Sequence, residues 1–370
     1  MKKLLENIFS IKKEGKYRVL RICWISIKFK RKNYDYLDEN GCFMHTHFLK
    51  HNHPNEFASF QYEMPYVMIR NPGDLPNPQI TEFVDICRFI DYLNTRHADV
   101  TFSVLDVGAR NGLISDGLNY LINLKNKYLV GIEPDVAEAS RILENPCMGQ
   151  YNEILPIALY SQEGEAILNV TQTPGCSSIL APNVELFESN GIAVADWFKV
   201  KETLKVKTTT LEKAFPSSGF DIVKIDTQGV EYDVLSGASD LFFAQNIAIS
   251  LETQFYEFYK GQKLIGDIFD FLTKKGYWLL KIDPNNESRD GLDWECDLKF
   301  IKAPTTIDNA EMLLKHCLFA MMCHRKSYVA FLLRNYGYNY LGGNEFAYLT
   351  KLLNLKYTDE GYKLPVIDSI

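Results

Sequence analysis

The 370-residue sequence lacks the patterns that mark secreted and membrane-spanning proteins. Its eight cysteines are scattered and none forms a C-x-x-C pair, so reduced thiols in a cytoplasmic protein are expected. No apolar run approaches the roughly 18 residues needed to cross a bilayer. No apolar stretch with a small-residue cleavage site follows the N-terminus, which argues against secretion. With 46% hydrophobic and 24% charged residues, the composition indicates a globular protein with a substantial core.

Positive charge is scarce over most of the chain. The formal net charge is −7, yet residues 1–32 carry eleven Lys or Arg against two Glu, a balance of +9 that leaves −16 for the rest. An acidic body is a poor nucleic-acid binder, so no nucleic-acid partner is expected. The basic arm, residues 1–33, interleaves cations with apolar residues. This mixture fits either a solvated terminus or peripheral contact with the anionic cytoplasmic face of a membrane, where each cation contributes about 1 kcal/mol.

Residues 34–100 show little periodicity and are expected to form an N-terminal extension. Four of the seven histidines stand within nine residues there; they are His45, His47, His51 and His53. Nothing in the sequence shows that they converge, so an ordinary polar loop, a zinc site and a lid supplying one base all stay open. The proline-rich run at 71–78 predicts a boundary, and a helix is expected over 80–93.

From residue 101, short apolar runs alternate with helical patterns. This alternation predicts an α/β fold with a doubly wound, mostly parallel sheet covered on both faces. The Val- and Thr-rich segment 161–210 interrupts it and predicts a small antiparallel insertion. Strands are expected at 102–107, 128–132, 154–159, 221–226, 247–252, 276–282 and 297–301, and helices at 113–124, 136–143, 232–239 and 264–275.

The end of the chain is expected to be helical, with 310–335 as the clearest stretch. Cys317 and the pair Cys323-His324 lie in this apolar stretch, which favours packing in the core over metal ligation. No metal site is therefore expected from these residues. The sequence divides into four predicted segments: the basic arm 1–33, the extension 34–100, a main domain 101–303 and a C-terminal helical segment 304–370.

The most informative stretch is V-L-D-V-G-A-R-N-G at 104–112. An apolar strand ends in Asp106, and Gly108 and Gly112 lie in the turn that opens the next helix. Glycines there let the backbone approach a ligand, and the helix N-terminus offers unpaired N–H groups. The spacing is G-x-x-x-G rather than the G-x-G-x-x-G of a dinucleotide site. NAD and FAD are therefore less favoured than a sulfonium cofactor, which carries no phosphates.

The next predicted strand ends in G-I-E-P, which places Glu133 at the same edge of the sheet. A carboxylate there can accept hydrogen bonds from both hydroxyls of an adenosine ribose. Gly108 and Glu133 are 25 residues apart, the length of one strand–helix–strand step. The turn and the acid together predict a site for S-adenosyl-L-methionine, with a purely structural glycine turn as the alternative.

Two further carboxylates end predicted strands, Asp226 in K-I-D-T-Q-G and Glu252 in S-L-E-T. In a sheet of this class the two strands are neighbours about 4.8 Å apart, so both acids would face the crevice beside a methyl donor. There they could orient an acceptor hydroxyl, take its proton or hold a divalent cation; capping a helix is the alternative. Asp226 is the first candidate for a general base, and a histidine of the extension is the second.

Several longer motifs lie in the same region: A-L-Y-S-Q-E-G-E-A-I-L at 158–168, G-C-S-S-I at 175–179, V-K-T-T-T-L-E at 206–212 and V-K-I-D-T-Q-G-V-E-Y-D-V-L-S-G-A at 223–238. With the glycine turn and G-I-E-P, they make residues 101–303 resemble the FkbM-type methyltransferases. This family takes its name from a polyketide O-methyltransferase and is common in sugar and glycan pathways. The resemblance implies a Rossmann-like methyltransferase fold and S-adenosyl-L-methionine as cofactor.

The resemblance also assigns roles to single residues. It implies that the methionine part of the donor contacts Asp106, Gly108, Ala109 and Gly112. It further implies that Glu133 binds the ribose, that Ala158 approaches the adenine, and that Ser177 and Ser178 lie toward the acceptor. The family usually reads D-x-E-G where this chain has Asp226-Thr-Gln-Gly229, so Gln228 lacks a charge there. Arg110 stands where a small or polar residue is common.

The sequence thus predicts an O-methyltransferase that acts on a hydroxyl of a sugar, glycan or related small molecule. We expect it in the cytoplasm, either free or peripheral at the cytoplasmic membrane face. Two alternatives remain. A nicotinamide-dependent oxidoreductase could use the same fold, although the dinucleotide turn is missing. A non-catalytic cofactor-binding module is suggested by the uncharged Gln228.

Overall fold

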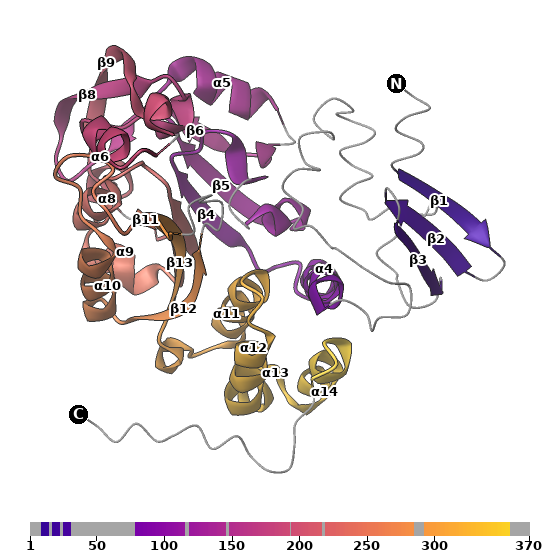
Figure 1. The fold of residues 1–370 in the computed structure, drawn as a ribbon. Helices are drawn as coiled ribbons and strands as arrows, with labels where there is room; N and C mark the ends of the chain where they lie inside the picture. Colours follow the sequence, from indigo (N-terminus) through magenta and orange to yellow (C-terminus); the bar gives the residue numbers. More distant parts are fainter. Residues whose placement is uncertain are drawn as a thin grey trace.

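A computed structural model of the chain describes residues 9–14, 17–22, 25–30, 78–114, 118–145, 148–192, 194–216, 219–284 and 292–355. The main sheet consists of β4 (Phe102–Val107), β5 (Lys127–Ile132), β6 (Glu153–Leu155), β10 (Ile222–Ile225), β11 (Ala248–Gln254), β12 (Tyr277–Pro284) and β13 (Glu295–Lys302). Its seven strands lie in the order β12-β13-β11-β10-β4-β5-β6 (Figure 1). The five strands from β11 to β6 are parallel to one another, and β13 runs antiparallel to both of its neighbours, β11 and β12. The predicted mostly parallel sheet is confirmed.

Helices cover both faces of this sheet (Figure 1). One face packs against α7 (Leu211–Ala214), α8 (Glu231–Ser236), α9 (Asp240–Gln245) and α10 (Ile265–Lys274), and the other against α4 (Pro78–Arg96), α5 (Val136–Glu144), α11 (Ala310–Met322) and α12 (Lys326–Leu332). Strand β4 shows why both faces need cover. Leu105 and Val107 join the first cluster, while Phe102 and Val104 join the second, because successive side chains of a strand point to opposite faces.

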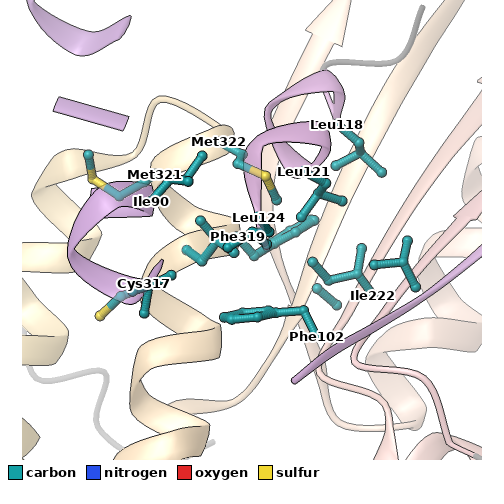
Figure 2. Close-up of a cluster of buried hydrophobic side chains, with 14 of the residues drawn as sticks. Ile90, Phe102, Leu118, Leu121, Leu124, Ile222, Cys317, Phe319, Met321 and Met322 are labelled. Atoms are coloured by element: carbon teal, nitrogen blue, oxygen red, sulfur yellow. The ribbon is translucent and has the colours of Figure 1, made fainter. Parts of the chain in front are cut away.

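Two helices from outside residues 101–303 complete the second face. Figure 2 shows Ile90 of α4 and Phe319 of α11 in one cluster with Phe102 of β4. Cys317, on α11, is fully buried in this cluster, and Cys323 is 4% exposed, so their predicted place in the core is confirmed. The boundaries at 100/101 and 303/304 stay sequence predictions, but the hydrophobic core continues across both.

The predicted antiparallel insertion is also confirmed. A second sheet has the order β7-β9-β8, with β7 (Ala158–Leu159), β8 (Gly164–Thr171) and β9 (Val200–Thr209), and β8 runs antiparallel to β9. The short helix α6 (Val184–Ser189) lies between β8 and β9. Two backbone hydrogen bonds dock this insertion onto the loop after β11: Asn183 N–H donates to the Phe258 carbonyl at 2.7 Å, and Lys260 N–H donates to the Ala181 carbonyl at 2.8 Å.

Two predicted elements are wrong in the part of the chain after β4. Instead of a helix over 113–124, the structure has two 3-10 turns, Gly112–Ile114 and Asn119–Asn123. The strand predicted over 154–159 divides into β6 and β7, which belong to different sheets. Pro156 stands between them and has no N–H to donate to a ladder, so pairing ends there.

The helix predicted over 310–335 is interrupted. α11 ends at Met322, and His324 follows with a φ of +57°, a conformation that ends a right-handed helix. After α12 come a π-helical turn (Leu333–Gly337), α13 (Tyr338–Leu341) and α14 (Gly343–Leu352). The predicted helical character of this segment is therefore confirmed, but the predicted continuity is not.

Part of the basic arm forms a sheet that the sequence analysis did not predict. β1 (Phe9–Glu14), β2 (Tyr17–Ile22) and β3 (Ile25–Lys30) pair in order as antiparallel neighbours. The four clustered histidines and residues 71–77 of the proline-rich run lie outside the described residues. Within the described part of the chain, no helix is long and apolar enough to cross a membrane.

Candidate active site

The turn after β4 has the backbone conformation that its glycines predict. Gly108 and Gly112 have φ values of +79° and +74°, a region that favours glycine. A Cβ atom at residue 108 would lie 1.8 Å from the carbonyl oxygen of Asp226, and one at residue 112 would lie 1.9 Å from that of Met148. The protein's own backbone therefore requires both glycines. Their contact with the methyl donor stays a prediction.

Asp106 holds the ends of two strands together. Its side chain is fully buried, and the Tyr151 hydroxyl donates to its Oδ2. Lys224 Nζ lies 3.2 Å from its Oδ1 and donates to the Gly108 carbonyl oxygen at 2.9 Å. The same Nζ is 3.7 Å from Asp226 Oδ2. One buried lysine thus links the predicted donor-binding acid to the predicted acceptor-side acid.

Glu133 lies directly beside this turn. The Ala109 N–H donates to the Ile132 carbonyl oxygen at 2.9 Å, which fixes the turn against the end of β5. Burial raises the pKa of Glu133, which is 4% exposed, and the nearby Arg110 guanidinium at 3.5 Å partly offsets this rise. Glu133 Oε1 accepts from the Asp135 N–H at 2.9 Å. Because a carboxylate offers about four lone-pair positions, Glu133 can still take ribose hydroxyls.

Asp226 and Glu252 meet at the carboxyl ends of β10 and β11, which are parallel neighbours as predicted. The side-chain Nε2 of Gln228 donates to Asp226 Oδ1 and to Glu252 Oε2, both at 2.8 Å. Asp226 is 28% exposed at its side chain and is therefore accessible from the crevice. The uncharged Gln228, noticed only as a departure from the family pattern, connects the two predicted catalytic acids.

The alternative role for Asp226, capping the next helix, is not seen, because the N-cap of α8 is Val230 and no side chain accepts a capping hydrogen bond there. Glu231, 1% exposed, accepts hydrogen bonds from the N–H groups of Thr227 and Gly229 at the start of α8. Burial raises the pKa of the Glu231 carboxyl to about 7. The Asp226 carboxylate instead accepts the hydrogen bond from Gln228 Nε2.

Charged side chains form two rows across this edge of the sheet, acids in the outer row and lysines in the inner row. Three strands carry a lysine two residues inside an aspartate, on the same face of the strand. The pairs are Lys224 with Asp226 at 3.7 Å, Lys299 with Asp297 at 3.5 Å, and Lys281 with Asp283 at 2.6 Å. On β11 the same positions are held by Ser250 and Glu252, so the lysine is replaced by a neutral hydroxyl.

This replacement gives Glu252 a distinct environment. Ser250 Oγ accepts from Lys299 Nζ at 2.7 Å and brings no charge of its own. The pKa of Glu252 is raised well above its ordinary value, first by burial and then by four neighbouring carboxylates, those of Asp226, Glu295, Asp297 and Glu231. A carboxylate with a raised pKa is a better proton acceptor than an ordinary one. The charge pattern therefore distinguishes Glu252 from Asp226.

The insertion reaches this acid pair through Tyr259. This tyrosine is fully buried, and its hydroxyl lies 2.8 Å from Gln228 Oε1 and 2.9 Å from the Cys176 carbonyl oxygen. Ser177 and Ser178 follow Cys176, but their hydroxyls accept from the backbone N–H groups of residues 171 and 180. Both serines thus shape the insertion, and their place beside an acceptor stays a prediction.

Ala158 is 6% exposed and lies in β7, where it pairs with Thr208 of β9. Its approach to adenine also stays a prediction. A cavity of about 430 Å³ lies at the opposite, amino-terminal edge of the main sheet, where Ser103 and Asp221 line it. It is therefore separate from the acid pair. Among the residues described, no three or more His, Cys, Asp or Glu side chains are grouped to hold a metal ion.

The sequence analysis missed two residues of the site. Lys224 could have been predicted, because a lysine within the apolar run I-V-K-I is buried with the strand and needs a nearby carboxylate. No sequence pattern indicates Tyr151, since it precedes β6 in a loop and contacts Asp106 only in the folded chain. Gln228 was noticed, but its bridging position depends on a φ of +58° that no local pattern indicates.

A doubly wound sheet with this turn and an acid closing the second strand defines the class of S-adenosylmethionine-dependent methyltransferases. Residues 106–279 match the family model of the Methyltransferase FkbM domain. The chain therefore carries a Methyltransferase FkbM domain over residues 106–279 and is a methyltransferase with S-adenosyl-L-methionine as its cofactor. This confirms the resemblance and decides against a nicotinamide-dependent oxidoreductase.

Solved structures of other methyltransferases are distant from this chain. The magnesium protoporphyrin IX methyltransferase of Synechocystis shares 10% identity over 70% of this chain and 95% of its own, with a TM-score of 0.31. The 1,6-didemethyltoxoflavin-N1-methyltransferase of Burkholderia thailandensis shares 10% over 65% and 98%, with a TM-score of 0.29. The glycopeptide N-methyltransferase MtfA shares 8% over 59% and 87%, with a TM-score of 0.26. No curated protein sequence matches the chain.

Proposed function

We propose that this enzyme transfers a methyl group to a hydroxyl of a sugar, glycan or related small molecule. The observation that carries the proposal is the acid pair, Asp226 and Glu252, held together beside the cofactor turn by Gln228. An unactivated hydroxyl has to lose its proton as it is methylated, and paired carboxylates at this edge can accept it. A carboxylate acceptor, already ionised at neutral pH, would need no such base.

When bound, S-adenosyl-L-methionine supplies a methyl group on a sulfonium, which an acceptor oxygen displaces in line. The protein's part is to hold the hydroxyl against the methyl group and to exclude water. Glu252 is the better proton acceptor, because its pKa is raised by burial and by the neighbouring acids. Asp226, more exposed and beside Lys224, is placed to orient the hydroxyl by accepting its hydrogen bond.

An aromatic pair near the acids supports a sugar as acceptor. Tyr256 and Trp294 lie with ring centroids 5.0 Å apart, and Tyr256 is 44% exposed. The backbone joins them to the acid edge, since Phe255 N–H donates to the Trp294 carbonyl oxygen at 2.9 Å and Trp294 precedes Glu295. Small-molecule sites typically combine aromatic walls with a few polar groups that orient the ligand. A sugar ring offers its apolar C–H faces to the aromatic rings and its hydroxyls to the polar groups.

The test is a transfer assay with a methyl-labelled donor and a panel of hydroxyl, amine and carboxylate acceptors. We expect product only with hydroxyl acceptors, and a loss in kcat of about 100-fold in Glu252→Gln. Asp226→Asn should raise KM for the acceptor more than it lowers kcat. Preferential methylation of amines, or full activity in Glu252→Gln, would contradict the proposal. Donor binding without turnover on any acceptor would instead favour a non-catalytic module.

We also propose that the basic arm brings the enzyme to anionic membrane surfaces. Its balance of +9 against an acidic remainder supports this, since each cation near such a surface contributes about 1 kcal/mol. Co-sedimentation with phosphatidylserine vesicles should show binding that weakens as salt rises. Removal of residues 1–32 should abolish it, and unchanged binding by the truncated protein would refute the proposal.

A further inference from the structure

Gln228 contacts both acids of the site at once. Its backbone has a φ of +58°, and Gly229 follows with a φ of +99°, so the chain turns sharply after β10. This turn directs the side chain back between β10 and β11. Its Nε2 atom is 2.8 Å from an oxygen of Asp226 and 2.8 Å from an oxygen of Glu252.

The chemistry of the neighbours fixes the orientation of this amide. The atom between Asp226 and Glu252 lies 2.8 Å from a carboxyl oxygen of each, and an NH₂ group with its two hydrogens can satisfy both oxygens at once. The amide oxygen then faces the Tyr259 hydroxyl at 2.8 Å, which can donate to it. The reverse orientation would set a carbonyl oxygen against two carboxylate oxygens. The Tyr259 hydroxyl carries one hydrogen and also lies 2.9 Å from the Cys176 carbonyl oxygen, so the two acids decide the orientation of the amide.

A divalent cation bridging the two acids would need the place that this nitrogen holds. Cations of this kind bind carboxylate oxygens at about 2.0 to 2.6 Å. The amide nitrogen, 2.8 Å from both oxygens, fills that bridging point and presents positively polarised hydrogens to it. The family pattern D-x-E-G would put a third carboxylate there in place of the amide. In this chain the bridging point is therefore neutral and already occupied.

We propose that the Gln228 amide takes the place of a bridging cation, positioning Asp226 and Glu252 so that the acid pair works without a divalent ion. The proposal rests on the proposed role of these acids toward the acceptor hydroxyl. It makes Gln228 a positioning residue, since it acts through the two carboxylates. It also explains how a chain that departs from the family pattern at this position keeps a functional acid pair.

The first test measures metal binding, which does not depend on turnover. Mn²⁺ is titrated against the full-length wild type, Gln228→Glu and Gln254→Glu, and binding is followed by electron paramagnetic resonance. Gln228→Glu should acquire one Mn²⁺ site and the wild type should have none. Gln254→Glu is the matched control: Gln254 Nε2 contacts Glu252 Oε2 at 3.4 Å but not Asp226, so the added charge should create no site. Mn²⁺ binding by the wild type that Asp226→Asn abolishes would overturn the proposal.

The second test measures methyl transfer and separates positioning from folding. Wild-type kcat should be unchanged by a chelator, while Gln228→Glu should lose at least about tenfold in kcat and recover part of it with Mn²⁺. Gln228→Ala, which has the same backbone demands as glutamine, should lose kcat with little change in the KM for the donor. Chelator-sensitive wild-type activity, or a Gln228→Ala variant with full kcat, would overturn the proposal. If no acceptor is methylated at all, the proposed function fails, and the Mn²⁺ titration still decides this inference.

The pH profile gives a third measurement that a structural role alone would not move. Without the amide donors, the two carboxylates would repel each other more strongly, so the acid limb of kcat should move up by about one pH unit in Gln228→Ala. The carboxyl groups that raise the pKa of Glu252 are those of Asp226, Glu231, Glu295 and Asp297, and Tyr259, Cys176 and Cys296 are also nearby. An unshifted profile would show that the amide does not act through the acids.

Discussion

The two halves of the site are built in different ways. The predicted cofactor half consists of the continuous stretch 106–112, whose glycines are required by direct contacts between backbones, and of Glu133. The acceptor half, Asp226, Gln228 and Glu252, is assembled from two strands and a turn, and it depends on the balance of charge across the sheet. Steric fit therefore dominates the first half and electrostatics the second. Added atoms should damage the cofactor half most, and changed charges the acceptor half.

The strongest test of this contrast is Gly108→Ala. The new Cβ would lie 1.8 Å from the Asp226 carbonyl oxygen at a φ of +79°, so steric overlap adds to backbone strain. We expect a loss of roughly 5 kcal/mol in the free energy of unfolding, with donor binding lost, measured by denaturation and by calorimetry with S-adenosylhomocysteine. Gly261→Ala is the control, because Gly261 has a φ of +81° but open space around its Cβ. Equal losses in both variants would show that strain alone is responsible.

Lys224→Met probes the link between the halves. It leaves the buried Asp106 without the lysine 3.2 Å away, and breaking a buried ion pair typically costs about 3 to 5 kcal/mol. We expect a loss near 4 kcal/mol in the free energy of unfolding, partly recovered when Asp106→Asn is added. Lys205→Met, which breaks an exposed pair with Glu165, should change the free energy of unfolding far less. A comparably small loss in Lys224→Met would mean that Lys224 does not join the two halves.

Glu231→Gln tests the electrostatic contribution to stability through its dependence on pH. Burial raises the folded-state pKa of Glu231 to about 7, above the ordinary 4.5, so the folded state holds the proton more tightly than the unfolded state. Its contribution to stability is therefore complete below pH 4.5 and is lost as pH rises through 7, by about 3 kcal/mol. Glu231→Gln should lack this decline, so the difference in free energy of unfolding between the two proteins should change by about 3 kcal/mol from pH 4.5 to 8, measured by urea denaturation. Parallel curves would refute the raised pKa.

The smallest effect is expected from Arg110→Ala in the cofactor half. Burial raises the pKa of Glu133 and Arg110 lowers it, so removal of Arg110 should raise this pKa further. If the ionised carboxylate binds the ribose, donor affinity should fall about fivefold near pH 6, equivalent to about 1 kcal/mol, and less at pH 8. Calorimetry at both values measures the difference. An equal change at both would mean that Arg110 acts otherwise than through Glu133.

The fold was largely predictable because its signals are local. Apolar strands such as β4, alternating with amphipathic helices, indicated the sheet, and the predicted bounds of β4 match the structure. The helix expected over 113–124 failed because apolar residues there pack as 3-10 turns under α11, a tertiary effect that periodicity does not register. The division at Pro156 was readable in principle, since proline cannot continue a ladder.

The sequence by itself determined the methyltransferase class, the cofactor turn and the strand ends that carry Glu133, Asp226 and Glu252, because these depend on short-range patterns. Only the tertiary structure decided how those acids are used. Sheet register aligned the three lysine–aspartate pairs with Ser250 and Glu252 of β11, and a turn with positive φ placed the Gln228 amide between Asp226 and Glu252. Charge balance depends on distances between strands far apart in sequence, and those distances exist only in the folded chain.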